Sequence, residues 1–168
     1  VIVIGAGNIF RGMKAAANGM DRTTADYMGM LATIMNGLAI QEAFDDIKIE
    51  SKVLSAIDVP QVCEAYAKRK GMKYLEEGKV VILTGGTGNP YFTTDSAAAL
   101  YALELECDTL MKGTKVDGVY DKDPKEFPDA KLYTSITHDE VIQKNLKVMD
   151  QTAFALCRDN KLTIKVFN

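Results

Sequence analysis

The chain has 168 residues, 47% of them hydrophobic, and its 20 basic and 23 acidic side chains give a formal net charge of −3. This length and apolar content are enough for one globular domain with a sizeable core. Because the chain is slightly acidic, it offers no broad positive field to a nucleic acid or an anionic membrane, and we expect neither as a partner. Its longest apolar runs are far shorter than a membrane span.

Residues that bind metals or form disulfides are sparse. Cys63, Cys107 and Cys157 stand far apart without C-x-x-C spacing, and the single histidine is His138. This pattern argues against a disulfide framework and against a zinc site. We therefore expect no metal site built from protein side chains, and a reducing, cytoplasmic location.

Short runs rich in β-branched residues alternate with segments of helical periodicity along the whole chain. Strands are predicted at 1–4, 48–55, 79–84, 108–112 and 162–167. This alternation is typical of a parallel sheet with helices on both faces. The predicted fold class is therefore α/β, a three-layer αβα sandwich with a mainly parallel central sheet. No repeat or linker divides the chain, so we expect residues 1–168 to form a single domain.

The first long helix is predicted from apolar residues that recur at spacings of three and four between residues 28 and 38, with Thr24 or Asp26 as a possible cap. It is apolar nearly all round, so we expect burial on two sides, either at an oligomer interface or deep inside one subunit. Further helices are predicted from Pro60 to about Gly78, from Asp95 to Glu106, and from about Asp150 to Asn160. The residues from Thr137 to Glu140 have the form of a capping box, which predicts the start of another helix.

Loops rich in glycine or hydroxyl groups follow three of the strands, and ligands of open α/β sheets bind outside the carboxyl ends of the strands. The first loop is Gly5-Ala6-Gly7-Asn8-Ile9-Phe10-Arg11-Gly12. Its small residues allow backbone N–H groups to approach an anion, and Arg11 can make a bidentate contact to a phosphate. It is neither a G-x-G-x-x-G motif nor a P-loop, and an ordinary turn is the alternative.

The second loop is Thr84-Gly85-Gly86-Thr87-Gly88-Asn89-Pro90-Tyr91-Phe92-Thr93-Thr94-Asp95. It combines a flexible backbone, threonine hydroxyls, an amide, two aromatic rings and a carboxylate, directly before a helix N-terminus that favours negative charge. This composition suits a phosphorylated ligand that carries a ring. The alternative is a long turn in which Thr94 or Asp95 only caps the helix.

The third loop runs from Lys112 to Pro124. Lys112, at a strand end, is well placed to neutralise a transferring phosphoryl group, while Thr114, Tyr120 and Asp123 could hold the ring and sugar of a nucleotide. Turn chemistry around residues 116–118 and 123–124 is the alternative.

Phosphoryl transfer is the reaction that these residue types suit best, because it depends on positioning and charge stabilisation more than on acid and base groups. A phosphate acceptor with a second pKa near about 6 is already ionised at neutral pH and needs no general base. Hydrolysis by a Ser/His/Asp triad is disfavoured, because His138 lies in the capping box and there is no G-x-S-x-G motif.

Four stretches of the sequence together resemble one known family. They are Gly5 to Gly12, the run Asp26-Tyr27-Met28-Gly29-Met30-Leu31-Ala32-Thr33-Ile34-Met35-Asn36, Thr87 to Ala97, and Lys112 to Tyr120. On these motifs the chain resembles the bacterial uridylate kinases (UMP kinases) of the amino acid kinase superfamily over essentially its whole length. The glycine loops are shared loosely by the superfamily. The Asp-x-Met-Gly-Met and Thr-Gly-Asn-Pro-Tyr-Phe-Thr-Thr-Asp motifs are much more specific.

The resemblance implies transfer of the ATP γ-phosphoryl group to UMP, giving UDP and ADP in pyrimidine biosynthesis, with Mg²⁺. Asp26 would hold the ribose hydroxyls, and the threonine-rich loop would hold the base and phosphate. The full UMP set would be Ala6, Asp26, Thr87, Gly88, Asn89, Pro90, Tyr91, Phe92, Thr93 and Thr94. The ATP set would be Gly7, Arg11, Thr114, Tyr120 and Asp123. The groups acting on the transferring phosphoryl would be Lys112 as charge stabiliser, Asp95 as orienting carboxylate, and Arg11.

The sequence departs from the family pattern at Ala6, where a third glycine is usual, so a negative φ is expected there. The family's opening strand with its Lys-x-Ser-Gly signature and its C-terminal strand pair are absent, and we expect this chain to be the central part of a longer kinase subunit. The resemblance also implies a homohexamer built from dimers through the helix after Thr24, with GTP and UTP as effectors. Asp150 would be a helix cap or a subunit contact.

Two other hypotheses stay open. One is a non-catalytic nucleotide-binding or storage protein of the same fold, and the other is a kinase for an amino acid-type acceptor. The presence of Lys112, Asp95 and the threonine-rich loop favours a catalytic protein, and Asp26 together with the aromatic pair favours a nucleoside monophosphate.

Overall fold

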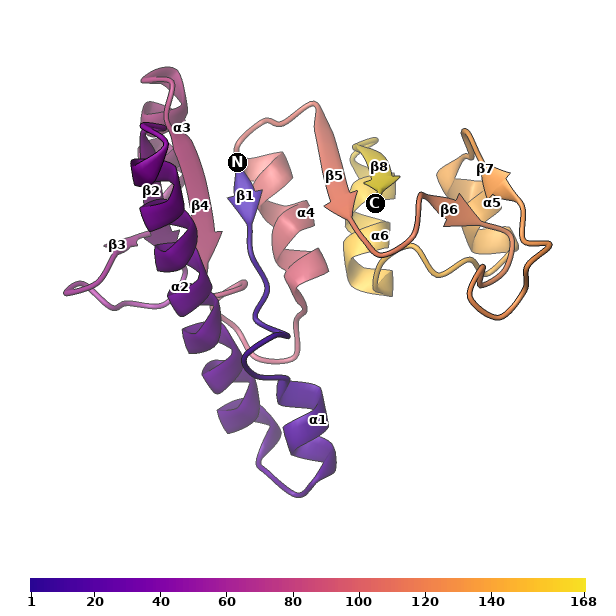
Figure 1. Cartoon of the computed structure of the whole chain (residues 1–168), viewed down its shortest axis with the longest axis horizontal. Helices are drawn as coiled ribbons and strands as arrows, with labels where there is room; N and C mark the ends of the chain where they lie inside the picture. Colours follow the sequence, from indigo (N-terminus) through magenta and orange to yellow (C-terminus); the bar gives the residue numbers. More distant parts are fainter. The chain divides into compact units, whose positions relative to one another are not determined.

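We describe a computed structural model that covers residues 1–168. The chain divides into two compact units, Val1–Ala97 and Ala98–Asn168, here called unit 1 and unit 2. Figure 1 labels their helices and strands along the chain. Helix α4 (Thr94–Glu104) carries the chain from one unit into the other.

Unit 1 contains a parallel sheet of four strands in the order β1-β4-β2-β3. The strands are β1 (Ile2–Val3), β2 (Ser51–Ser55), β3 (Glu64–Ala65) and β4 (Val80–Thr84). The β-branched and leucine residues of the two central strands are buried, except for the half-buried Val80, as expected for strands that are covered on both faces. Because the strands are parallel, the loops that follow β1 and β4 leave the same edge of the sheet.

Helices α1 (Gly12–Ala17), α2 (Arg22–Asp46) and α3 (Lys68–Glu76) complete unit 1. The N-cap of α2 is Asp21, whose Oδ1 accepts hydrogen bonds of 2.8 Å from Thr24 N and 2.9 Å from Thr24 Oγ1. These bonds favour the charged carboxylate, so they lower the pKa of Asp21. The prediction of Thr24 or Asp26 as the cap was therefore wrong, because the helix begins one turn earlier.

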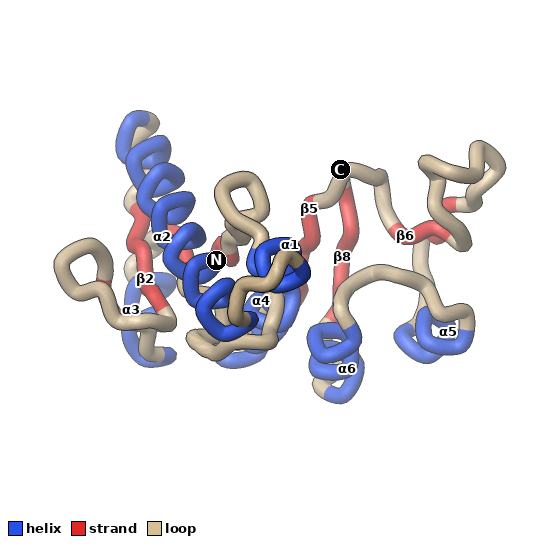
Figure 2. The backbone as a smooth tube through the Cα atoms, turned by 90° about the horizontal axis from the view of Figure 1, so that it is seen from below, coloured by secondary structure: helices blue, strands red, loops and turns tan.

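Helix α2 packs against β2 and β4, and Figure 2 shows it beside β2. The helix presents two different faces. Its buried residues include Met30, Ile34 and Gly37. On the opposite face the exposed side chains are Tyr27, Met28, Leu31 and Met35. Residues 1–168 by themselves therefore bury only one face of α2. Both predicted alternatives for the other face, an oligomer interface and burial deep inside one subunit, stay predictions.

The helix predicted from Pro60 was also wrong in its first half. Residues 59–63 form a turn in which the N–H groups of Val62 and Cys63 donate to Val59 O. The next residues pair as β3 with the end of β2, and α3 begins only at Lys68. Residues 64–65 therefore form a strand, because they pair with the otherwise unpaired edge of β2, although their local sequence pattern suited a helix.

Unit 2 contains the parallel pair β5 (Thr109–Gly113) and β8 (Thr163–Phe167), in register from Thr109↔Thr163 to Gly113↔Phe167. A short antiparallel pair, β6 (Val119–Tyr120) and β7 (Leu132–Tyr133), follows β5. Helices α5 (His138–Gln143) and α6 (Gln151–Asp159) complete the unit. The predicted Thr137–Glu140 capping box is confirmed, and so is the prediction that Asp150 caps the next helix.

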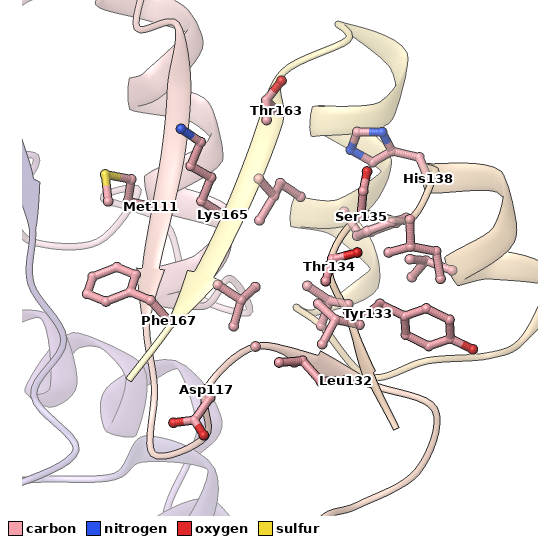
Figure 3. A pocket seen from close by; sticks show the side chains of 18 residues that line it. Met111, Asp117, Leu132, Tyr133, Thr134, Ser135, His138, Thr163, Lys165 and Phe167 are labelled. Atoms are coloured by element: carbon pink, nitrogen blue, oxygen red, sulfur yellow. The ribbon is translucent and has the colours of Figure 1, made fainter. Parts of the chain in front are cut away.

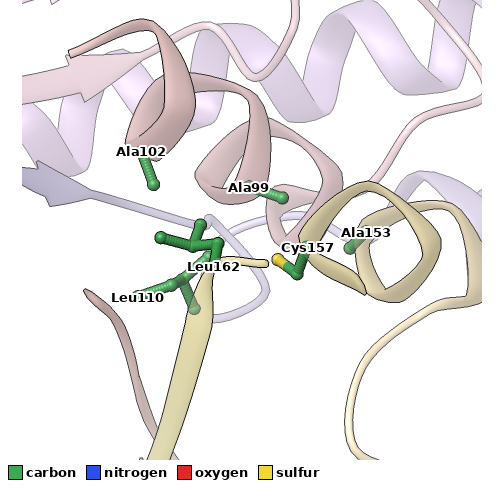
Figure 4. Packing of buried hydrophobic residues seen from close by; sticks show 6 residues of the cluster. All are labelled: Ala99, Ala102, Leu110, Ala153, Cys157 and Leu162. Carbon is green, nitrogen blue, oxygen red and sulfur yellow. The ribbon is translucent and has the colours of Figure 1, made fainter. Parts of the chain in front are cut away.

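Small side chains dominate the core of unit 2 (Figure 4). The buried cluster consists of Ala99, Ala102, Leu110, Ala153, Cys157 and Leu162. Ala99 and Ala102 of α4 and Ala153 of α6 belong to this cluster, so small side chains from both helices contribute to the core. Burial raises the pKa of the Cys157 thiol to about 11, so this cysteine packs as a small apolar group and is not a reactive nucleophile.

The α/β class with mainly parallel strand pairing is confirmed, since only the short β6–β7 pair is antiparallel. None of the helices is both long enough and apolar enough to cross a membrane.

Candidate functional site

A pocket of about 470 Å³ lies in unit 1, where the loops after β1 and β4 meet the first half of α2. The two loops are in contact with each other, because a Cβ placed on Gly5 would lie 3.2 Å from Thr94 Oγ1. Nine residues predicted for the site line this pocket: Ala6, Gly7, Arg11, Asp26, Thr87, Asn89, Phe92, Thr93 and Thr94.

The first loop closes a helical turn that leaves free N–H donors. Ala6 O accepts hydrogen bonds of 2.9 Å from Ile9 N and 2.8 Å from Phe10 N. The N–H groups of Gly7 and Asn8 therefore stand as the unpaired donors of a first turn, the kind of group that binds anions. Ala6 is buried, and it is not among the residues with positive φ, so its Cβ is accommodated as expected.

Arg11 is held against this turn. Its Nε donates a hydrogen bond of 2.9 Å to Gly7 O, and a Cβ on Gly7 would lie 3.4 Å from the same nitrogen. The side chain is otherwise exposed, which leaves its two terminal NH₂ groups available to a ligand. Free backbone donors and a guanidinium thus occupy the same end of the loop, and such a combination suits a phosphate.

Asp26 is the carboxylate of the pocket, and its side chain is only 10% exposed. Its Oδ2 accepts a hydrogen bond of 2.7 Å from Arg22 Nε and another of 2.7 Å from the backbone N–H of Tyr91. Its Oδ1 accepts no hydrogen bond from the chain and lies against Gly12, where an added Cβ would be 2.8 Å away. One carboxylate oxygen is therefore committed to the protein and the other is available.

The second loop depends on left-handed backbone. Gly85 and Gly88 have φ values of 77° and 76°, and a Cβ on either would come within 2.9 Å of the chain near residues 55 and 56. Tyr91 also has a positive φ, of 71°, although it is not a glycine. Only a loop that is held firmly keeps such a residue in this conformation.

Two residues that hold the loops were not predicted as site residues. Thr33 Oγ1 accepts a hydrogen bond of 2.7 Å from Gly85 N, and Asn36 Nδ2 donates bonds of 2.8 Å to Gly5 O and to Asn8 Oδ1. Asp26, Thr33 and Asn36 are spaced by seven and three residues, so they lie on one face of α2. Polar residues at helical spacing inside an apolar helix are the signal that could have identified them.

Three residues predicted for UMP, namely Gly88, Pro90 and Tyr91, belong to the second loop but do not line the pocket. Asp95 lies in the first turn of α4 and is half-buried. These positions stay predictions.

The remaining predicted residues lie in unit 2. Lys112 Nζ donates a hydrogen bond of 3.0 Å to Val148 O. Thr114 Oγ1 accepts from Val116 N and donates to Val116 O, and Asp123 Oδ1 accepts from Lys125 N, so both side chains take part in turns, as the alternative interpretation had it. Tyr120 and Asp123 line a second pocket, of about 490 Å³.

A larger pocket, of about 850 Å³, also lies in unit 2, and its lining includes side chains of β8, of the stretch between Leu132 and His138, and of Met111 and Asp117 (Figure 3). It includes none of the residues predicted to bind UMP or ATP or to act on the phosphoryl group. Nowhere in the chain do three or more His, Cys, Asp or Glu side chains come together as they do around a metal ion.

Known proteins resemble this chain in sequence and in structure. Residues 1–168 match the sequence profile described as the Amino acid kinase family. The chain is 58% identical over 167 residues to the uridylate kinases of two strains of Cereibacter sphaeroides, and the match covers 99% of this chain and 68% of each of those proteins.

Solved structures of kinases with the same names are also similar to this chain. The UMP kinase from Ureaplasma parvum matches with a TM-score of 0.95 and 47% identity, over 99% of this chain and 72% of that one. The UMP kinase from Bacillus anthracis matches with a TM-score of 0.94 and 39% identity, over 99% and 69%. The uridylate kinase from Archaeoglobus fulgidus matches with a TM-score of 0.70 and 27% identity, over 97% and 72%. This chain belongs to the amino acid kinase family.

Proposed function

We propose that this protein transfers the γ-phosphoryl group of ATP to UMP, giving UDP and ADP for pyrimidine nucleotide synthesis. The observation that carries the proposal is the pocket of unit 1, where an available carboxylate oxygen of Asp26 and the anion-binding end of the first loop line one cavity. Relatives named uridylate kinase at 58% identity support it.

In this proposal the acceptor phosphate binds to the free N–H groups of Gly7 and Asn8 and to the guanidinium of Arg11. The ribose hydroxyls donate to Asp26 Oδ1. The uracil ring contacts the second loop, where Asn89 supplies an amide, Phe92 supplies a ring, and the threonines supply hydroxyls. The full set is Ala6, Asp26, Thr87, Gly88, Asn89, Pro90, Tyr91, Phe92, Thr93 and Thr94.

The chemistry needs little more than alignment and charge. Above a second pKa of about 6 the UMP phosphate is ionised, so its oxygen attacks the γ-phosphorus of ATP without a general base. The bond from that phosphorus to the β,γ-bridging oxygen breaks, and ADP leaves with the electron pair. Lys112 neutralises the charge that develops on the transferring group, while Asp95 orients the reactants. For this task Lys112 gives up its hydrogen bond to Val148 O.

ATP is the donor in this proposal. It is bound by Thr114, Tyr120 and Asp123, and also by Gly7 and Arg11, which contact the phosphates of both the donor and the acceptor where these meet. Mg²⁺ in kinases is held mainly by substrate phosphates and waters, with one or two carboxylates. A chain without any cluster of three or more such ligands suits that mode of binding. The ion would supply charge neutralisation between the phosphates.

The proposed assembly is a homohexamer built from dimers, in the cytoplasm, with GTP and UTP as effectors and residues 1–168 within one kinase domain. The outward side chains Tyr27, Met28, Leu31 and Met35 of α2 support a dimer contact, because they form an exposed apolar stripe at helical spacing.

A coupled assay of ADP release tests the proposal on the protein produced from its complete natural coding sequence. The acceptors are UMP, CMP, AMP, aspartate, glutamate and acetylglutamate, each with ATP and Mg²⁺. We expect turnover with UMP well above that with any amino acid. Turnover with an amino acid alone would show a different kinase, and nucleotide binding without turnover would show a storage protein.

A further inference from the structure

We infer that Arg22 is a positioning residue of the acceptor site, which fixes the Asp26 carboxylate and the Tyr91 loop together and so makes the site prefer a ribonucleotide to its 2′-deoxy form. The inference rests on the proposed function, because it gives the Asp26 carboxylate a ribose to bind. None of the sequence motifs singled out Arg22, which is the first residue of α2.

Arg22 and Asp26 lie one helical turn apart on α2, and their ion pair is partly buried. Arg22 Nε lies 2.7 Å from Asp26 Oδ2, with the two side chains 30% and 10% exposed. A pair this sheltered is less screened by water and salt than a surface pair. Arg22 also lines the pocket beside Asp26, so the guanidinium is part of the site wall and not a remote surface group.

The second contact of Arg22 is with the loop. Its guanidinium carbon lies 5.1 Å from the centroid of the Tyr91 ring, in the range of cation–π contacts. The backbone N–H of Tyr91 donates to the same Oδ2 that accepts from Arg22. Arg22, Asp26 and Tyr91 thus form a closed triangle that links α2 to a residue with the unusual φ of 71°.

This triangle decides which carboxylate oxygen a ligand meets. Both donors converge on Oδ2, so rotation of the carboxylate breaks two hydrogen bonds at once. Oδ1 of Asp26 is left without a hydrogen-bond partner. The one side-chain oxygen or nitrogen that is both fully buried and without a hydrogen bond is Ser51 Oγ. Asp26 Oδ1 is therefore not fully buried and still reaches solvent. An oxygen fixed in this way has two lone pairs for the neighbouring 2′ and 3′ hydroxyls of a ribose.

Only arginine makes both contacts. Its planar guanidinium donates in its plane to a carboxylate while it stacks face-on against a ring, whereas a lysine ammonium is a point charge on a flexible stem. Arg22→Lys therefore keeps the charge but loses either the stack or the directed Nε bond. Arg22→Gln removes the charge and keeps a polar side chain of similar reach.

The experiment measures kcat and KM for UMP and for 2′-deoxy-UMP in the unmutated protein, Arg22→Lys, Arg22→Gln and a control, Arg158→Gln. Arg158 pairs with Asp159 at 2.7 Å outside the pocket, so the control removes an arginine–aspartate pair that is more exposed than the pair of Arg22 and Asp26. In both Arg22 variants we expect kcat/KM for UMP to fall at least about tenfold, mainly through KM, which is the scale of losing one charge-assisted hydrogen bond. The value for 2′-deoxy-UMP should fall much less, so the preference for UMP shrinks.

Equal losses for UMP and 2′-deoxy-UMP, or no loss for either, would overturn the inference, since a merely structural arginine does not sense the 2′ hydroxyl. If both Arg22 variants unfold below the assay temperature, Tyr91→Leu, which removes the ring in contact with Arg22, replaces them. The ratio of kcat/KM for UMP to that for 2′-deoxy-UMP should then fall in Tyr91→Leu, and an unchanged ratio would overturn the inference. Absence of UMP turnover and of calorimetric UMP binding in the unmutated protein would contradict the proposed function itself, and the inference with it.

Discussion

The hydroxyl of Thr33 accepts a hydrogen bond of 2.7 Å from the backbone N–H of Gly85, which is 52 residues further along the chain. The same hydroxyl donates a bond of 2.6 Å to Met30 O, one turn earlier in α2. Both partners are buried, so this bond fixes the start of the second loop to the inner face of the helix.

Thr33→Val should destabilise the fold, because it keeps the shape but leaves the buried N–H of Gly85 without an acceptor. The expected loss of unfolding free energy is about 1–3 kcal/mol, measured by urea denaturation. Thr33→Ser retains the hydroxyl and should lose clearly less. Equal losses in the two variants would mean that the hydroxyl contributes no more than the methyl group, and no loss in Thr33→Val would mean that the hydroxyl contributes nothing.

The glycines of α2 should respond to alanine in opposite directions. A Cβ on Gly37 would collide with Thr84 Cγ2, whereas a Cβ on Gly29 has nothing within 4 Å. Gly37→Ala should therefore lose about 1–3 kcal/mol by overpacking. Gly29→Ala should gain up to about 1 kcal/mol from helix propensity. Urea midpoints measure both, and a stabilised Gly37→Ala would show that α2 packs less closely on β4 than described.

Asp26→Asn should separate the two substrates. The amide keeps the size of the side chain, but it loses the charge that holds Arg22 and accepts the ribose hydroxyls. We expect KM for UMP to rise at least about tenfold, with a much smaller change for ATP. Steady-state kinetics with each substrate varied in turn measures this. An equal loss for both substrates would contradict the assignment of Asp26 to the UMP half of the site.

Asp21 should make part of the stability depend on pH. Its pKa is lowered in the folded chain by hydrogen bonds from Thr24. The contribution of the charged carboxylate is therefore fully present above the unfolded pKa, near 3.8, and is lost as the pH falls through the lower folded value.

Asp21→Asn keeps a capping side chain without the charge. The difference in thermal midpoint between the unmutated protein and Asp21→Asn should be largest near neutral pH and should vanish below the folded pKa. Asp21→Ala, which removes the cap itself, serves as the comparison and should melt earlier than Asp21→Asn near neutral pH. A difference that stays constant with pH would contradict the role given to the carboxylate.

Local patterns predicted most of the secondary structure and the chemistry-bearing loops. Each strand predicted from β-branched runs is present, for example β4 at Val80–Thr84 against a predicted 79–84. The capping box at Thr137 was predicted because its motif is complete within four residues. For Asp150, a helix cap was one of two predicted roles, and the structure has it as the N-cap of α6. The two loops of unit 1 were predicted as a ligand site because small and hydroxyl-bearing residues follow strands directly, whereas the individual UMP and ATP residues were named only from the family resemblance.

What the sequence could not predict depends on contacts between distant segments. The edge of β2 pairs with residues 64–65, and no local pattern around Pro60 reports that edge. Asn36 reaches Gly5 across 31 residues, so its role is visible only once the loops are in place. The exposed stripe on α2 is a similar case, because periodicity alone does not tell which of two apolar faces meets the sheet.

The central claim is that a phosphoryl group passes from ATP to UMP, and the most direct measurement follows that group. The protein, produced from its complete natural coding sequence, is incubated with ATP labelled at the γ-phosphorus, Mg²⁺ and UMP, and the nucleotides are separated by chromatography. The account predicts that the label appears in the β-phosphate of UDP and that its appearance requires UMP. Label that stays in ATP, or that is released as inorganic phosphate regardless of UMP, would contradict it.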